Sequence, residues 1–183
     1  MNKVKNISKT KLQVIDIYEH ETEVESYYYK NKTIVLDFSF AGAFASVKSN
    51  GINSYMQDER EFADRFKNIL HDIRYLSTNT ADDLFNSKGY RHCHVVESKN
   101  ENKIRAIIRN IFKDLDIEDN VFEQELGEET FYQLGLHSEI RFFGTVHANV
   151  FKVYFIDYYH ELNYDQRRNT RNVKNCNFCI VKS

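Results

Sequence analysis

The chain has 183 residues, of which 42 % are hydrophobic and 28 % charged, a composition that excludes a largely disordered protein. Its net charge of −2 excludes gross electrostatic attraction to nucleic acid, and it has no apolar run of about 18 residues that would predict a membrane span. The three cysteines are an odd number, and no apolar segment follows the basic N-terminus. We therefore expect a reduced, cytoplasmic protein without a disulfide framework or a secretory signal.

The N-terminal third is rich in β-forming residues. The expected strands cover residues 9–19, 24–30 and 33–40. Short polar turns separate them, so neighbouring strands should be antiparallel. The small residues of 41–51 predict a loop, and this loop is the best candidate for a boundary. We expect a β-rich segment over residues 1–56 and an α/β unit over 57–183, or one continuous domain.

Two amphipathic helices are predicted further along the chain. Apolar residues recur at helical spacing over residues 58–76, where Asp58 can cap the first turn. The segment Ser98–Glu101 has the spacing of a capping box and should open a second helix, over residues 98–113. The other expected elements are a loop over 77–87 that can include one helical turn, a short strand over 90–96, and an acidic helix or loop ended by Gly127.

The apolar and aromatic density is highest in residues 139–158, where side chains alternate with the period of a strand on both sides of Ala148-Asn149. Asn tolerates the positive φ of a tight turn, so we expect an antiparallel hairpin. The predicted fold class is α+β. An antiparallel sheet should have this hairpin at its centre, packed by the two main helices.

One candidate site is a zinc centre. Cys176 and Cys179 have the spacing of half a zinc site, and His92 and His94 would share one face of the short strand. Four nitrogen and sulfur ligands suit a closed structural site. The alternative is that these are reduced cysteines and ordinary histidines, and we favour no metal or other cofactor.

A second candidate site lies at the end of the hairpin, where Asp157 and His160 come close in sequence to Arg168. A histidine beside arginines can act as an acid or base on a phosphodiester, while the arginine stabilises the developing charge. The run from IRFFG to YYHEL resembles the last strands of RelE-type bacterial toxins, with Arg141 opening the first strand. The resemblance implies a ribosome-dependent endoribonuclease. The alternative is that these residues only complete a strand.

The third candidate is a binding surface without catalysis. Residues 114–140 contain no Lys or Arg. The expected partner-binding residues are Asp114, Asp116, Glu118, Asp119, Glu123, Glu125, Glu128 and Glu129. Carboxylates can occupy a groove that normally receives phosphates, although such a run can also be a solvated helix face. The block of acids and the many aromatics resemble in style the anti-CRISPR inhibitors of phages and mobile elements.

From these patterns we favour a non-enzymatic inhibitor or regulator from a phage or mobile element. It should bind a protein partner, such as a nucleic-acid-handling enzyme, rather than nucleic acid or a membrane. The RelE-like nuclease is the alternative.

Overall fold

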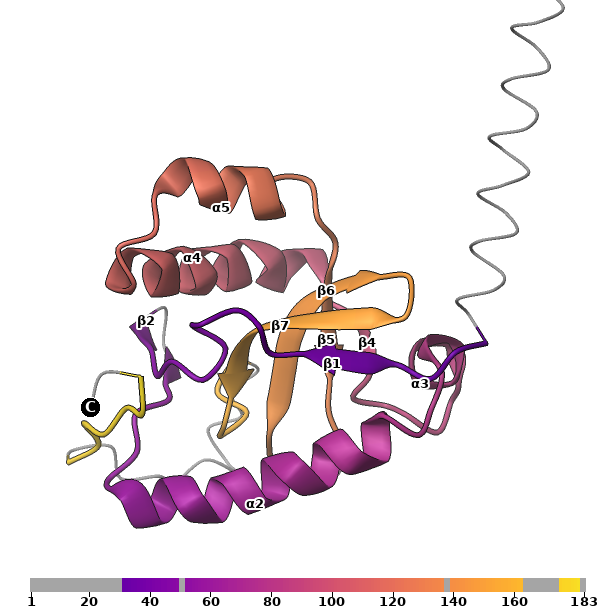
Figure 1. Cartoon of the computed structure of the whole chain (residues 1–183), viewed down its shortest axis with the longest axis horizontal. Coiled ribbons are helices and arrows are strands. Elements are labelled where there is room, and N and C mark those ends of the chain that lie inside the picture. The colour runs from indigo at the N-terminus through magenta and orange to yellow at the C-terminus, as the bar shows by residue number, and fades with distance from the viewer. Residues whose placement is uncertain (1–30, 50–51, 137–138, 163–174, 182–183) are drawn as a thin grey trace, which may run out of the picture.

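The computed structural model describes residues 31–49, 52–136, 139–162 and 175–181. The strands predicted over residues 9–19 and 24–30 lie outside the described residues. In Figure 1 the helices α4 (Ser98–Asp114) and α5 (Asp119–Leu126) are stacked on one side of a sheet, and α2 (Glu59–Leu76) lies on the other side. No helix among the described residues is long and apolar enough to cross a membrane.

The main sheet has five strands in the order β1-β7-β6-β5-β4. Their bounds are Val35–Asp37 for β1, His94–Val95 for β4, Phe131–Leu134 for β5, Arg141–His147 for β6 and Val150–Asp157 for β7. A separate two-stranded sheet pairs β2 (Lys48–Ser49) with β3 (Ile52–Asn53). The α+β class and the central C-terminal hairpin are therefore confirmed.

The sheet is mixed, whereas we expected it to be antiparallel throughout. Strand β1 runs parallel to β7, with Val35 paired to Val150. The turn of the hairpin fixes this arrangement, because Val35 N–H donates to the carbonyl of Asn149 at 2.8 Å and Asn149 Nδ2 donates to the carbonyl of Thr33 at 2.9 Å. The division into segments 1–56 and 57–183 stays a prediction, and β1 of the first lies in the same sheet as β7 of the second.

The hairpin formed by β6 and β7 is buried and carries an irregularity. The register shifts between Phe143 and Gly144, where a Cβ on the glycine would collide with the backbone oxygen of Lys152. Beside this bulge the rings of Phe143 and Phe155 are stacked, with their centres 4.8 Å apart. The turn residue with positive φ is Ala148, at 56°, and not Asn149 as we expected; the Asn149 side chain instead donates to the carbonyl of Thr33, next to β1.

The predicted helices are present, but one cap is wrong. Asp58 caps α2 by accepting from the N–H of Glu61 at 2.9 Å, as expected. In α4 the N-cap is Glu97, without a side-chain hydrogen bond, so the capping box predicted at Ser98 does not form. Its expected acidic partner, Glu101, instead pairs with Arg105 one turn along the helix, at 2.9 Å.

The predicted connecting segments also contain elements of their own. A six-residue helix α3 (Ala81–Asn86) lies within the loop predicted over 77–87, and a capping box between Thr80 and Asp83 starts it. The strand predicted over 90–96 is reduced to the two residues of β4. Phe155, at the centre of the hairpin, is buried, with 1 % of its surface exposed.

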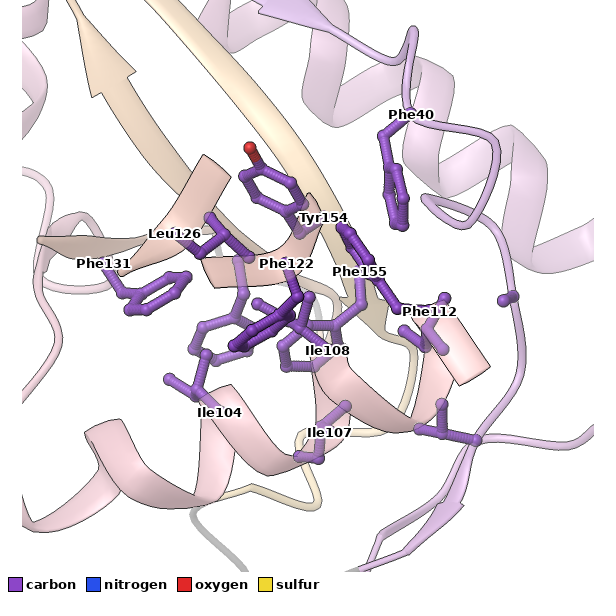
Figure 2. Packing of buried hydrophobic residues seen from close by; sticks show 14 of the residues in the cluster. Phe40, Ile104, Ile107, Ile108, Phe112, Phe122, Leu126, Phe131, Tyr154 and Phe155 are labelled. Carbon is purple, nitrogen blue, oxygen red and sulfur yellow. The ribbon is translucent and has the colours of Figure 1, made fainter. Parts of the chain in front are cut away.

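Two hydrophobic clusters cover the two faces of the sheet. Figure 2 shows the first, in which Phe122 and Leu126 of α5 and Ile108 of α4 pack toward Phe155 of β7. The second cluster joins α2 to the opposite face, with Ile69 of α2 in the same cluster as side chains of β6 and β7. Burial on both faces explains why β7 is apolar along most of its length.

Candidate functional site

The predicted acidic residues lie on α5 and its flanks, in the outermost layer of the molecule (Figure 1). Phe122 and Leu126 fix the helix by burying its apolar side against α4 (Figure 2). The guanidinium of Arg105 donates to the backbone carbonyls of Leu126 and Glu129, and that of Arg109 lies 4.5 Å from the ring centre of Phe122. The helix is thus held at its middle and at its C-terminal end.

Three of the eight predicted acids are engaged in ion pairs within the chain. These join Glu123 to Arg109 at 2.5 Å, Glu125 to Lys152 at 3.0 Å, and Glu129 to His147 at 3.3 Å when the histidine is protonated. Asp114, at the end of α4, is exposed. The remaining four, Asp116, Glu118, Asp119 and Glu128, are also exposed, and we call them the acidic face. They direct negative charge into solvent.

Asp157 closes the end of β7 and does not face solvent. It is 1 % exposed, and its carboxylate accepts hydrogen bonds from the backbone N–H groups of Tyr159 at 3.2 Å, Glu161 at 3.0 Å and Leu162 at 2.8 Å. A carboxylate that accepts several backbone N–H groups stabilises the turn that contains them. The structure therefore gives this residue an organising role in the turn after the hairpin.

Arg141 is the register partner of Asp157 and is only 4 % exposed. Burial lowers the pKa of its guanidinium, while the carboxylates of Asp157 and Asp72 act in the opposite direction. Its Nη1 donates to the carbonyl of Ile140 at 2.7 Å. Held in this way, the guanidinium serves as a buried counter-charge between α2 and the hairpin.

His160 is the most accessible of the three described members of the predicted acid–base group. It is half-buried, has a φ of 56°, and its ring lies 6.5 Å from that of His92. The structure thus brings Arg141, Asp157 and His160 to the same end of the hairpin. Arg168, the fourth predicted member, lies outside the described residues.

The four predicted zinc ligands have different surroundings. His92 lies beside His160, and His94 Nε2 is 3.3 Å from the side-chain nitrogen of Gln133. Cys179 Sγ accepts from the N–H of Ser46 at 3.2 Å, and Cys176 is half-buried in the same C-terminal segment. Within the described ranges, no three His, Cys, Asp or Glu side chains lie together as metal ligands. The alternative zinc site stays a prediction; among the described residues the CxxC segment packs near β2, whereas His92 and His94 lie at or next to β4.

Sequence reasoning missed a pocket of about 850 Å³ between α2 and residues 88–92. Asp72 and Tyr75 of α2 line it together with Lys88 and Arg91. The adjacent Gly, basic and His residues of 88–92 are the only local signal that could have indicated an anion-binding loop. Their approach to α2 is a tertiary contact that no spacing in the sequence encodes.

Fold and site define an α+β protein with an exposed acidic helix and a pocket that is lined in part by charged residues, on opposite sides of a mixed sheet. The chain belongs to the family described as "Uncharacterised protein UU032", whose model matches residues 39–183. It is similar to a protein of that description from Ureaplasma parvum serovar 3, with 26 % identity over 153 residues that cover 83 % of this chain and 82 % of the relative. No solved structure matches the chain.

Proposed function

We propose that the protein is a non-enzymatic binding protein whose acidic face contacts a basic surface on a protein partner. The observation that carries the proposal is the exposure of four carboxylates at the start of α5 and on its two flanks, while the apolar side of the helix is fixed to the core. Because Phe122 and Leu126 hold α5 on α4, these charges are presented without a large loss of conformational entropy on binding.

The expected partner is a nucleic-acid-handling protein, because carboxylates can lie where a basic groove receives phosphates. Such a contact would inhibit or regulate the partner, as inhibitors from phages and mobile elements do. The ion pairs of Glu123, Glu125 and Glu129 remove part of the negative charge of α5. The contact should therefore depend on the acidic face rather than on the whole acidic segment.

The test neutralises the acidic face without changing side-chain size. The variant combines D116N, E118Q, D119N and E128Q. The control carries the same charge change on exposed residues elsewhere, E59Q, D64N, D82N and E97Q. The wild type and both variants are tagged, used to capture partners from a host lysate, and then titrated against the purified partner.

We expect a protein that the wild type and the control bind and that the neutralised variant binds at least tenfold more weakly, chiefly through slower association. Raising the salt concentration should slow association of the wild type, because screening shortens below about 8 Å above physiological ionic strength. Equal capture by all three proteins contradicts the proposal. So does the recovery of ribosomes or RNA in place of a protein.

A RelE-like ribosome-dependent endoribonuclease is the second candidate function. The location of His160 beside His92, next to the buried pair Arg141 and Asp157, supports it. In that case expression should arrest growth, and His160→Ala should abolish the arrest while the variant still folds. His147→Ala is the control, because this exposed histidine lies at the other end of β6. Harmless expression of the wild type contradicts this candidate.

A further inference from the structure

The pocket on the α2 side of the sheet has the dimensions and rigidity of a ligand site. Its volume is about 850 Å³, within the range of about 300–1,000 Å³ that is usual for small-molecule sites. The C-terminal half of α2 forms one wall, residues 88–92 form the other, and Gly135 and Leu136, which follow β5, complete the lining. None of these residues belongs to the acidic face.

The loop over residues 88–92 is fixed before any ligand binds. Three contacts hold it: Tyr90 OH donates to Asn79 Oδ1 at 2.9 Å, Cys93 Sγ donates to the carbonyl of Gly135 at 3.3 Å, and Gln133 Nε2 donates to the carbonyl of His92 at 3.1 Å. They tie the loop to the end of α2 and to β5. A preformed loop reduces the entropic cost of binding.

Two tyrosines form an aromatic wall. Tyr75 is 49 % exposed, which is unusual for a large aromatic side chain, and its ring centre lies 6.4 Å from that of Tyr90. Tyr90 supports it from the loop and is itself half-buried. An exposed aromatic face on a fixed support offers a flat surface on which a planar ring can stack.

The charges of the pocket are arranged asymmetrically. Lys88 and Arg91 are exposed on the loop, whereas Asp72 lines the inner part and is 2 % exposed. Behind Gly135 the buried side chain of Arg141 lies so close that a Cβ on the glycine would collide with its Cδ. Arg141 therefore offsets the charge of Asp72, and the entrance is positive.

From this arrangement we infer that the pocket binds a nucleoside phosphate. The base stacks on Tyr75, and the phosphate groups contact Lys88 and Arg91. A neutral aromatic ligand would leave the two cations unused, and a simple anion would leave the aromatic wall unused. The ligand has two sources, a free nucleotide or the terminal nucleotide of an RNA strand.

Calorimetric titration of the full chain tests the inference. The probes are UDP, ADP and GDP, a hexaribonucleotide with a 5′-phosphate, and uridine and pyrophosphate as fragments. We expect at least one nucleoside diphosphate or the oligonucleotide to bind at least tenfold more tightly than either fragment. Comparable affinity for diphosphate and oligonucleotide identifies a free nucleotide as the ligand, and much tighter binding of the oligonucleotide identifies an RNA terminus.

Variants locate the site. Tyr75→Ala and the pair Lys88→Ala/Arg91→Ala should each weaken binding about tenfold or more, while Tyr75→Phe should change it less than about threefold. The pair Arg60→Ala/Lys113→Ala removes the same charge from exposed positions outside the pocket and should leave binding unchanged. Circular dichroism verifies that each variant folds. The inference is overturned if no nucleotide or oligonucleotide binds at millimolar concentration, or if the pocket variants bind like the wild type.

Discussion

Arg141 and Asp157 face each other in register at the base of the β6–β7 hairpin, and both are buried. The Asp157 carboxylate stabilises the charge of Arg141 and also accepts three backbone N–H groups of the turn that follows β7. Asp72 adds a second carboxylate from α2. Arg141, Asp157 and Asp72 therefore link the β6–β7 hairpin, the turn that follows it and helix α2.

We predict that Asp157→Asn lowers the free energy of unfolding by about 3–5 kcal/mol, because it leaves a buried guanidinium with less counter-charge and removes one hydrogen-bond acceptor. Denaturant unfolding monitored by circular dichroism measures the change. The control is Asp64→Asn, at an exposed position, which should change stability by less than about 0.5 kcal/mol.

A double-mutant cycle separates the charge effect from the loss of the turn. Arg141→Met in the Asp157→Asn background should recover part of the loss, with a coupling of about 0.5–3 kcal/mol. Additive effects would mean that the two residues act independently, contrary to the register pair described above.

The bulge in β6 gives a second prediction. Gly144→Ala should destabilise the protein by about 1–3 kcal/mol, because the added Cβ collides with the backbone oxygen of Lys152 and the strands must separate. Gly89→Ala is the matched control, since the nearest atom to its Cβ would be Ser87 Oγ at 3.3 Å in an exposed loop. Equal stability of the two variants would show that the hairpin tolerates a larger separation of β6 and β7.

The hairpin and the two long helices could be predicted because their patterns are local. The sequence patterns of β6, β7 and α2 indicate directly which side chains are buried, by alternation in the two strands and by helical spacing in α2. Asp58 is adjacent to the helix that it caps. The parallel pairing of β1 could not be predicted, because Asn149 and Val35 are far apart in the sequence and meet only in the folded chain. The cap predicted at Ser98 does not form because the helix begins one residue earlier than expected, with Glu97 in the N-cap position.

The candidate sites also differ in whether local sequence patterns could predict them. The exposure of the acidic face agrees with a contiguous run of acids, whose partner-binding role stays a prediction. Spacing alone suggested that Cys176 and Cys179 meet His92 and His94, but the two pairs belong to segments that pack in different places. The pocket at Tyr75 depends on a loop that approaches α2 only in the folded chain.

The cysteines should differ in reactivity. Burial raises the pKa of Cys93, which is 3 % exposed and donates to the carbonyl of Gly135, so little reactive thiolate is present at neutral pH. Cys179 is also buried, and Cys176 is half-buried. With a chromogenic disulfide at pH 7.5, Cys176 should react first and the other two only on unfolding. Cys176→Ser should remove the fast phase, and a fast phase that persists in this variant contradicts the prediction.

The last prediction concerns alkaline pH. Burial raises the pKa of Tyr158 far above the ordinary tyrosine value, and burial also raises the pKa of Tyr154. A raised pKa in the folded state means that the folded protein holds the phenolic proton more tightly than the unfolded chain does. The associated stability is therefore fully present below the unfolded pKa of about 10 and decreases as pH rises from there toward the folded value.

For Tyr158 alone, the free energy of unfolding should fall by about 1.4 kcal/mol per pH unit above pH 10. Denaturant unfolding at intervals between pH 8 and 11.5 measures this slope, and absorbance at 295 nm should show the buried tyrosines ionising only together with the loss of circular dichroism. Tyr158→Phe is the comparison, because it removes the titrating group and only a weak hydrogen bond to the carbonyl of Phe44, at 3.4 Å. Its stability should decline less steeply above pH 10. Parallel curves for the two proteins would mean that Tyr158 reaches solvent in the folded state, which its complete burial contradicts.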